Sequence, residues 1–166
     1  MKRTRWWWPT SYAPSVAEID LVQLAATGFA GVIIDLDNTL VGYRQLAPDD
    51  LHARWIIAAR EVGLQVVLVT NNATPWAIEV ARKLGIPCIP NARKPLPRGF
   101  RRALQLLKLP RKAVVVVGDQ LFTDVLGAKL CGLAVILVEP LVAHDPLNTR
   151  WLRHIERWLL RGLPRN

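Results

Sequence analysis

Five short apolar runs, separated by longer segments of helical character, dominate the middle of the chain. The runs cover residues 31–35, 64–70, 86–89, 113–118 and 133–138. They are apolar throughout instead of alternating with polar residues, which is typical of strands covered on both faces in a parallel sheet. We therefore expect an α/β domain with a five-stranded parallel sheet and right-handed crossovers.

Four segments between or after these runs carry helix signals. They cover residues 48–62, 74–84, 96–109 and 121–131. The first opens with Pro48 and two acids, and the second with Thr74 as a candidate N-cap before Pro75. Proline suits the first helical position, and acids suit the positive helix end. In sheets of this kind the active site lies beyond the carboxyl ends of the strands.

Polar side chains stand where four of the five runs end. Carboxylates that crowd at one edge repel one another and favour a bound cation. Oxygen ligands select a hard ion, and a site with few carboxylates suits Mg²⁺ better than Ca²⁺, while the lack of adjacent His or Cys argues against zinc. The candidate site residues are Asp35, Asp37, Thr70, Asn71, Lys94, Asp119 and Asp124.

The same edge carries groups suited to a phosphoryl group. Lys94 is the candidate phosphate binder, although its neighbours Arg93 and Arg98 are alternatives. Thr70 is a second phosphate ligand or a cap for the following turn, and Asn71 either contacts phosphate or is an ordinary turn residue. An ionised aspartate can attack phosphorus without a separate base, and water then hydrolyses the aspartyl phosphate.

Asp35 and Asp37 have different expected tasks. Asp37 follows two positions after Asp35, on the same side if the chain is still extended. It is then placed to protonate the leaving alcohol and to accept a proton from the attacking water.

The run Asp35-Leu36-Asp37-Asn38-Thr39 resembles the DxDxT signature of the haloacid dehalogenase superfamily. Later residues match its other three motifs in the right order and on the expected elements. The resemblance implies a three-layer α/β sandwich and a Mg²⁺-dependent phosphatase. It implies that Asp35 is the nucleophile and Asp37 the general acid and base. Thr70 would then bind phosphate, and Lys94 would hold both the phosphate and the nucleophile. Mg²⁺ would be bound by Asp35, the main-chain carbonyl of Asp37 and Asp119, with Asp124 supporting Lys94 or a metal-bound water.

No room remains for the cap domain that many members of this superfamily carry. Asp37 and Thr70 are 33 positions apart, and Thr70 and Lys94 are 24 apart. One helix and one strand fill each interval. An open site suits a substrate large enough to cover it, such as a protein, a nucleic acid end or a lipid head group. Asp20-Leu21 and the runs of residues 31–40 and 118–128 resemble the YqeG-type branch of the capless class III phosphatases, some of which are phosphatidylglycerophosphate phosphatases.

The net charge and the two ends of the chain indicate what kind of partner the protein binds. The 166 residues suit one domain, and 22 Lys and Arg against 13 Asp and Glu give a net charge of +9, which favours anionic partners. The segment 1–15 is basic and tryptophan-rich, and residues 147–162 have the pattern of a basic amphipathic helix. Both could lie on an anionic membrane surface, or their tryptophans could pack on the domain.

Three functions follow as hypotheses. The first is a phosphatase for a phospholipid head group such as that of phosphatidylglycerophosphate, cytoplasmic and peripheral at the inner membrane surface. We expect no secretory signal and no membrane-spanning run. The second is a phosphatase of soluble or macromolecular phosphates. The third is a non-catalytic protein that binds RNA or the ribosome, through arginine and tryptophan.

Overall fold

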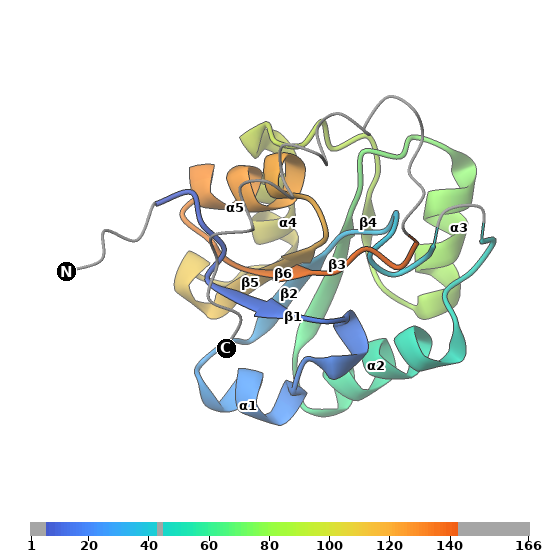
Figure 1. Cartoon of the computed structure of the whole chain (residues 1–166), viewed down its shortest axis with the longest axis horizontal. Helices are drawn as coiled ribbons and strands as arrows, with labels where there is room; N and C mark the ends of the chain where they lie inside the picture. Colours follow the sequence, from blue (N-terminus) through green and yellow to red (C-terminus); the bar gives the residue numbers. More distant parts are fainter. Residues whose placement is uncertain (1–5, 43–44, 143–166) are drawn as a thin grey trace.

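The fold is built on one fully parallel sheet of six strands, with the order β1-β6-β5-β2-β3-β4 (Figure 1). The computed structural model describes residues 6–42 and 45–142. The strands are β1 (Ser11–Ala13), β2 (Gly31–Ile34), β3 (Gln65–Val69), β4 (Cys88–Ile89), β5 (Val114–Gly118) and β6 (Ala134–Val138). All five predicted strands are present, so the α/β prediction is confirmed.

The predicted strand number was one too low, because β1 forms the edge of the sheet beside β6. Ser11 aligns with Ile136 and Ala13 with Val138 in a parallel register. The amide of Thr10 also donates to the Val135 carbonyl over 2.8 Å. A three-residue strand that begins with serine lacks the apolar run by which the other strands were found.

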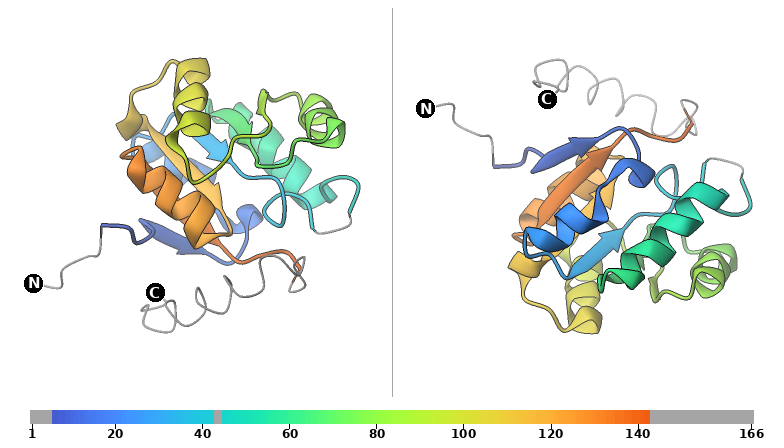
Figure 2. Two further views of the ribbon diagram at one scale, coloured as in Figure 1. Left: turned by 90° about the horizontal axis from the view of Figure 1, so that it is seen from above. Right: turned by 90° about the horizontal axis from the view of Figure 1, so that it is seen from below.

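Helices cover both faces of the sheet (Figure 2). One face carries η1 (Val16–Glu18), α1 (Leu21–Ala26), α2 (Asp50–Glu61) and α3 (Pro75–Leu84), and the other carries α4 (Pro97–Leu107), η3 (Leu121–Val125) and α5 (Leu126–Leu130). A short η2 (Arg111–Ala113) precedes β5. The four predicted helices are present, whereas η1 and α1 were not expected. The last predicted helix begins with a π turn, η3, before it continues as α5.

Successive residues of the central strand point into two different cores. Val32 and Ile34 of β2 pack in the core beneath α1, α2 and α3, and Ile33 packs in the core beneath α4 and α5. All three side chains are buried. Because both faces of the sheet are covered, apolar residues are required at every position, which explains the uninterrupted apolar runs.

The chain reverses its winding direction at β2. From β2 it proceeds through β3 and β4 to one side, and then returns to β5 and β6 on the other side. A crevice for ligands is expected where the order reverses, at the carboxyl ends of β2 and β5. Asp35 and Asp119 directly follow these two strands.

Part of the prediction about the ends of the chain lies outside the described residues. The amphipathic helix expected over 147–162 falls there entirely, as do residues 1–5 of the basic N-terminal segment. In the ranges that the structure covers, no helix combines the length and hydrophobicity that crossing a bilayer requires.

Candidate active site

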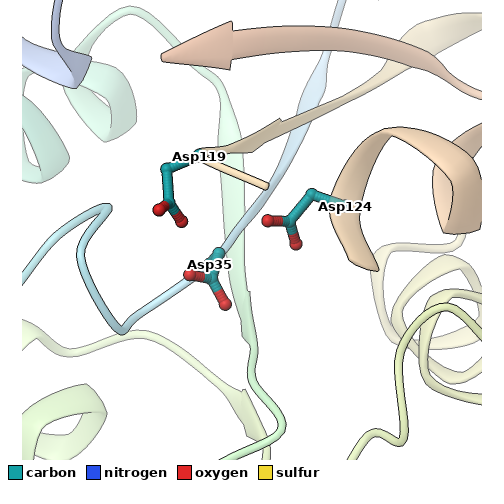
Figure 3. A group of neighbouring side chains, drawn as sticks. All are labelled: Asp35, Asp119 and Asp124. Carbon is teal, nitrogen blue, oxygen red and sulfur yellow. The ribbon is translucent and has the colours of Figure 1, made fainter. Parts of the chain in front are cut away.

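Three carboxylates meet at the carboxyl edge of the sheet (Figure 3). Asp35 follows β2, Asp119 follows β5, and Asp124 lies in η3. One oxygen of each lies within 4.8 Å of the others, and all three residues are buried. Three of the four predicted carboxylates therefore converge, although Asp35 and Asp124 are 89 positions apart in the sequence.

Lys94 lies among these carboxylates. Its Nζ donates to Asp124 Oδ1 over 2.6 Å and also to Asp35 Oδ1. Its side chain is only 3% exposed. The other oxygen of Asp124 accepts from the Gln120 amide over 3.2 Å, which fixes this carboxylate between the lysine and the start of η3.

The buried charges perturb one another. Burial raises the pKa of Asp35 well above its usual range, and the nearby Asp124 and Asp119 raise it further against the opposing effect of Lys94. Burial alone would lower the pKa of Lys94, but Asp124 and Asp35 outweigh it, so the pKa of this ammonium is raised. Lys94 therefore stays charged, while ionised Asp35 needs further positive charge beside it.

The donor set fits a hard divalent cation. The three buried carboxylates each offer an oxygen within 4.8 Å of the others, and the ammonium group of Lys94 pairs with Asp35 and Asp124. Oxygen donors without His or Cys suit Mg²⁺. Since burial raises the pKa of Asp35, a cation beside this carboxylate would stabilise its ionised form.

The chain turns sharply shortly after β2. Asn38 has a φ of 64° in the left-handed region, and its amide donates to the Val41 carbonyl over 2.7 Å. Asparagine tolerates this conformation better than most residues. The turn also brings Thr39 Oγ1 within 3.0 Å of Asp119 Oδ1, to which it donates.

Asp37 is held apart from the carboxylate trio by residues that follow β3. Thr70 Oγ1 donates to Asp37 Oδ2 over 3.1 Å, and Asn72 Nδ2 donates to Asp37 Oδ1 over 3.3 Å. The Thr70 hydroxyl also accepts from the Asn72 amide over 3.0 Å. Thr70 thus caps the turn and orients Asp37 at once, and its contact with phosphate remains a prediction.

Asn71 binds the main chain of Lys94 with both ends of its amide. Its Oδ1 accepts from the Lys94 amide over 2.6 Å, and its Nδ2 donates to the Lys94 carbonyl over 3.1 Å. Two parallel hydrogen bonds fix the backbone from which the lysine side chain reaches Asp35. The predicted phosphate contact of Asn71 stays a prediction, and its observed partner is Lys94.

The alternatives to Lys94 lie elsewhere. Arg93 and Arg98 line a separate cavity beyond the loop, whereas Lys94 reaches Asp35 and Asp124. Sequence reasoning missed the roles of Thr39 and Asn72 in holding Asp119 and Asp37. Both stood beside predicted site residues at strand ends, and that position was the available signal.

The chain is similar in sequence to known hydrolases and phosphatases. A family model described as haloacid dehalogenase-like hydrolase matches residues 42–132. The chain is 36% identical over 157 residues to the probable phosphatase YqeG of Bacillus subtilis (strain 168), covering 95% of this chain and 91% of that protein. It is 28% identical over 164 residues to the chloroplastic phosphatidylglycerophosphate phosphatase 1 of Chlamydomonas reinhardtii, covering 92% of this chain and 61% of that one.

Solved structures share the fold. An uncharacterized protein from Listeria monocytogenes serotype 4b superposes with a TM-score of 0.57 at 17% identity, covering 72% of this chain and 85% of the other. A haloacid dehalogenase-like hydrolase from Brucella suis 1330 superposes with a TM-score of 0.55 at 12% identity, covering 76% and 92%. At these identities the likeness concerns the architecture alone.

Proposed function

The chain belongs to the haloacid dehalogenase-like hydrolases, and we propose that it is a Mg²⁺-dependent phosphatase that attacks phosphate monoesters with Asp35. The observation that carries this proposal is the buried ion-pair network of Asp35, Lys94 and Asp124 beside Asp119. A nucleophile, a cation to restrain it and a metal-binding donor set meet there at the carboxyl edge of the sheet.

In the first step an oxygen of Asp35 forms a bond to phosphorus, and the bond from phosphorus to the ester oxygen breaks. The leaving alkoxide takes a proton from Asp37. Asp37 is positioned for this by Thr70 and Asn72, which hold its two oxygens. The products are the free alcohol and an aspartyl phosphate on Asp35.

In the second step water attacks the phosphorus of the aspartyl phosphate and gives its proton to Asp37. The bond between phosphorus and Asp35 breaks, which restores the carboxylate and releases inorganic phosphate. Lys94 holds Asp35 in place throughout and offsets negative charge on the transferring oxygens.

Asp35 and Asp119, with the main-chain carbonyl of Asp37, would hold the Mg²⁺, and Asp124 would support Lys94. When bound, the ion shields the nucleophile from the negative charge of the substrate and stabilises charge on the phosphoryl oxygens.

For the substrate we propose a phospholipid head group such as that of phosphatidylglycerophosphate. Two relatives bear the name of this activity. No cap domain interrupts the described chain between β2 and β4, so the site is open to a large substrate. Two large apolar side chains in loops beyond β2 and β4, Leu46 and Leu96, are 83% and 56% exposed. Apolar side chains near an open site suit a lipid surface.

Turnover of 4-nitrophenyl phosphate tests the chemistry. We expect hydrolysis that requires Mg²⁺ and is lost at least a thousandfold in Asp35→Asn, because the amide cannot attack phosphorus. Asp50→Asn is the matched control, since Asp50 is exposed in the first turn of α2, away from the carboxylate trio. Salt-sensitive binding of RNA without any turnover would sink the proposal.

A screen of phosphate monoesters tests the substrate. We expect a higher kcat/KM for phosphatidylglycerophosphate in neutral detergent micelles than for soluble monoesters such as glyceraldehyde 3-phosphate. That soluble compound is chosen because a 27% identical relative over 116 residues, from Pyrococcus abyssi, is named for it. The reverse ranking would replace the lipid assignment and leave the phosphatase chemistry intact.

A further inference from the structure

A second basic feature lies beside the site and takes no part in the steps above. Three arginines line a cavity of about 160 Å³ between the loop after β4 and the start of α4. They are Arg93, Arg98 and Arg102, and all three are exposed. Within residues 6–42 and 45–142, none of their guanidinium groups makes an ion pair or a hydrogen bond.

The position of Arg98 is electrostatically unfavourable in the isolated protein. It lies in the first turn of α4, which contains no acidic residue. The first turn of a helix carries positive partial charge and disfavours a cation. Three guanidinium groups of like charge also repel one another around the cavity. An anion in the cavity would relieve both effects.

The cavity shares a wall with the site. Asn91 and Ala92 line the cavity, and their amides donate to the carbonyls of Asn72 and Thr70 over 3.1 and 2.9 Å. Arg93 directly precedes Lys94, so their Cα atoms are about 3.8 Å apart. Lys94 extends inward to Asp35, while Arg93 lines the cavity. Neighbouring residues of one loop thus face the cavity and the carboxylate site.

The close approach of α4 to this loop depends on a glycine. A Cβ on Gly99 would lie 2.7 Å from the Ala92 Cβ and 3.2 Å from the Ala92 carbonyl oxygen. The first distance is too short for a Cβ contact, so a side chain at this position would push the helix and the loop apart. Gly99 thus allows the first turn of α4 to pack against the loop, which places Arg98 and Arg102 opposite Arg93.

We propose that this cavity is a second anion subsite, which binds a phosphate group of the substrate other than the one transferred to Asp35. The inference rests on the proposed function and specifies its substrate class: a molecule with a terminal phosphate monoester and a second, unhydrolysed phosphate nearby. Guanidinium groups bind phosphate oxygens in pairs and lose little entropy in doing so. The phosphodiester of a phospholipid head group and the second phosphate of a soluble bisphosphate share this chemistry.

The test compares three substrates on one set of variants. The substrates are 4-nitrophenyl phosphate, deacylated glycerophosphoglycerophosphate, and phosphatidylglycerophosphate in neutral detergent micelles. For the Arg98→Gln/Arg102→Gln double variant we expect kcat/KM to fall at least tenfold more on the second and third substrates than on the first. Equal losses on the second and third substrates would mean that the phosphate alone is recognised, whereas a loss confined to the micellar substrate would overturn the proposal in favour of a lipid surface contact.

Arg101→Gln is the matched control, because Arg101 lies on the same exposed helix but does not line the cavity. It should change the ratio between substrates by less than twofold. If the double variant loses activity equally on all three substrates, or on none, the arginines only attract anions in general or form a solvated surface, and the subsite is refuted.

A binding measurement separates this inference from the proposed function. In the Asp35→Asn background, calorimetry with glycerophosphoglycerophosphate should show at least a tenfold weaker Kd when Arg98 and Arg102 are also replaced by Gln. A wild-type chain that hydrolyses none of the substrates would refute the phosphatase, and this titration would still decide the subsite. An unchanged Kd would refute the subsite even if hydrolysis of 4-nitrophenyl phosphate is normal.

Discussion

At the scale of single residues, the site concentrates negative charge that the folded protein tolerates only in part. Asp35 and Asp124 share the buried ammonium group of Lys94, and Asp119 lies within the same cluster of carboxylates. Evolved sites commonly keep such unfavourable groups because the reaction needs them, at a cost in stability. The nucleophile should therefore be a destabilising residue when no cation is bound.

We predict that Asp35→Asn raises the free energy of unfolding by about 1 kcal/mol in EDTA at neutral pH. The raised pKa of Asp35 means that the folded state binds a proton more tightly than the unfolded chain does. Ionisation of Asp35 thus disfavours folding once the pH exceeds the pKa of an aspartate in the unfolded chain, which is about 4. The stabilisation by Asn should be small near pH 4 and should grow as the pH rises.

Urea denaturation between pH 5 and pH 8 measures the difference in free energy of unfolding between Asp35→Asn and wild type. Asp50→Asn is the control, at an exposed carboxylate. Adding Mg²⁺ should narrow the gap between wild type and Asp35→Asn, because the ion binds the folded wild type more tightly. A variant that is less stable than wild type at every pH would show that Lys94 outweighs the burial of Asp35.

Asn71 provides a second test at this scale, since positioning and phosphate binding differ in their kinetics. Asn71→Ala removes both hydrogen bonds to the Lys94 main chain. We expect kcat to fall about tenfold to a hundredfold with little change in KM, because Lys94 is then less well placed in the transition state. A variant that raises KM at unchanged kcat would instead identify Asn71 as a phosphate ligand.

At the scale of elements, the end of β5 and the π turn of η3 must approach closely. A Cβ on Gly118 would lie 2.3 Å from Cγ of Asp124. That carboxylate cannot easily move, because Lys94 and the Gln120 amide both hold it. The absence of a side chain on Gly118 is therefore a condition for the ion pair. π turns are frequent at functional sites, and this one presents Asp124 to Lys94.

We predict that Gly118→Ala lowers the free energy of unfolding by about 1–3 kcal/mol and lowers kcat more than tenfold. Gly63→Ala is the control, because no atom lies within 4 Å of its added Cβ and only its positive φ is strained. It should cost stability but leave kcat within twofold. Thermal unfolding and steady-state kinetics on both variants separate the effect on the fold from the effect on the site.

The elements also mark how far sequence reasoning reaches. Long apolar runs and helix caps predicted the strands β2 to β6 and the helices α2 to α4, because both faces of the sheet are buried. The strand β1 was missed, since its three residues gain their stability from β6, which is more than a hundred positions away. Such long-range pairing leaves no local pattern.

The same division applies to the site. Convergence of Asp35, Lys94, Asp119 and Asp124 could be predicted, since parallel strands end at one edge. The partners of Asn71 and Thr70 could not be predicted, because a polar side chain at a strand end can bind backbone, another side chain or a ligand with similar energy. Only coordinates assign the Asn71 amide to the Lys94 main chain.

At the scale of the whole molecule, the lipid assignment predicts an oriented contact with membranes. A net charge of +9 attracts the chain to anionic vesicles, and Leu46 and Leu96 are exposed at the edge that carries the site. We predict that the Leu46→Ser/Leu96→Ser double variant binds phosphatidylglycerol vesicles about tenfold more weakly, as measured by co-sedimentation. The reason is that the apolar area of the two leucines no longer enters the membrane interface.

Leu130→Ser is the matched control, since Leu130 is 51% exposed at the end of α5, just before β6 begins at the opposite edge. It should bind vesicles as the wild type does. If Leu130→Ser weakens vesicle binding as much as the double variant does, the protein contacts the membrane without a preferred orientation. The site would then not face the lipid.

The place of β6 has a consequence for how the protein is made. Among the described residues this strand comes last in the sequence, yet it lies between β1 and β5, which are synthesised earlier. On the ribosome, β1 has no neighbour to bond with until residues 134–138 have emerged from the exit tunnel. A nascent chain that stalls before that point would leave β1 unpaired and would expose part of both apolar cores, because β6 contributes side chains to each. Chaperones would have to protect such a chain until β6 has emerged.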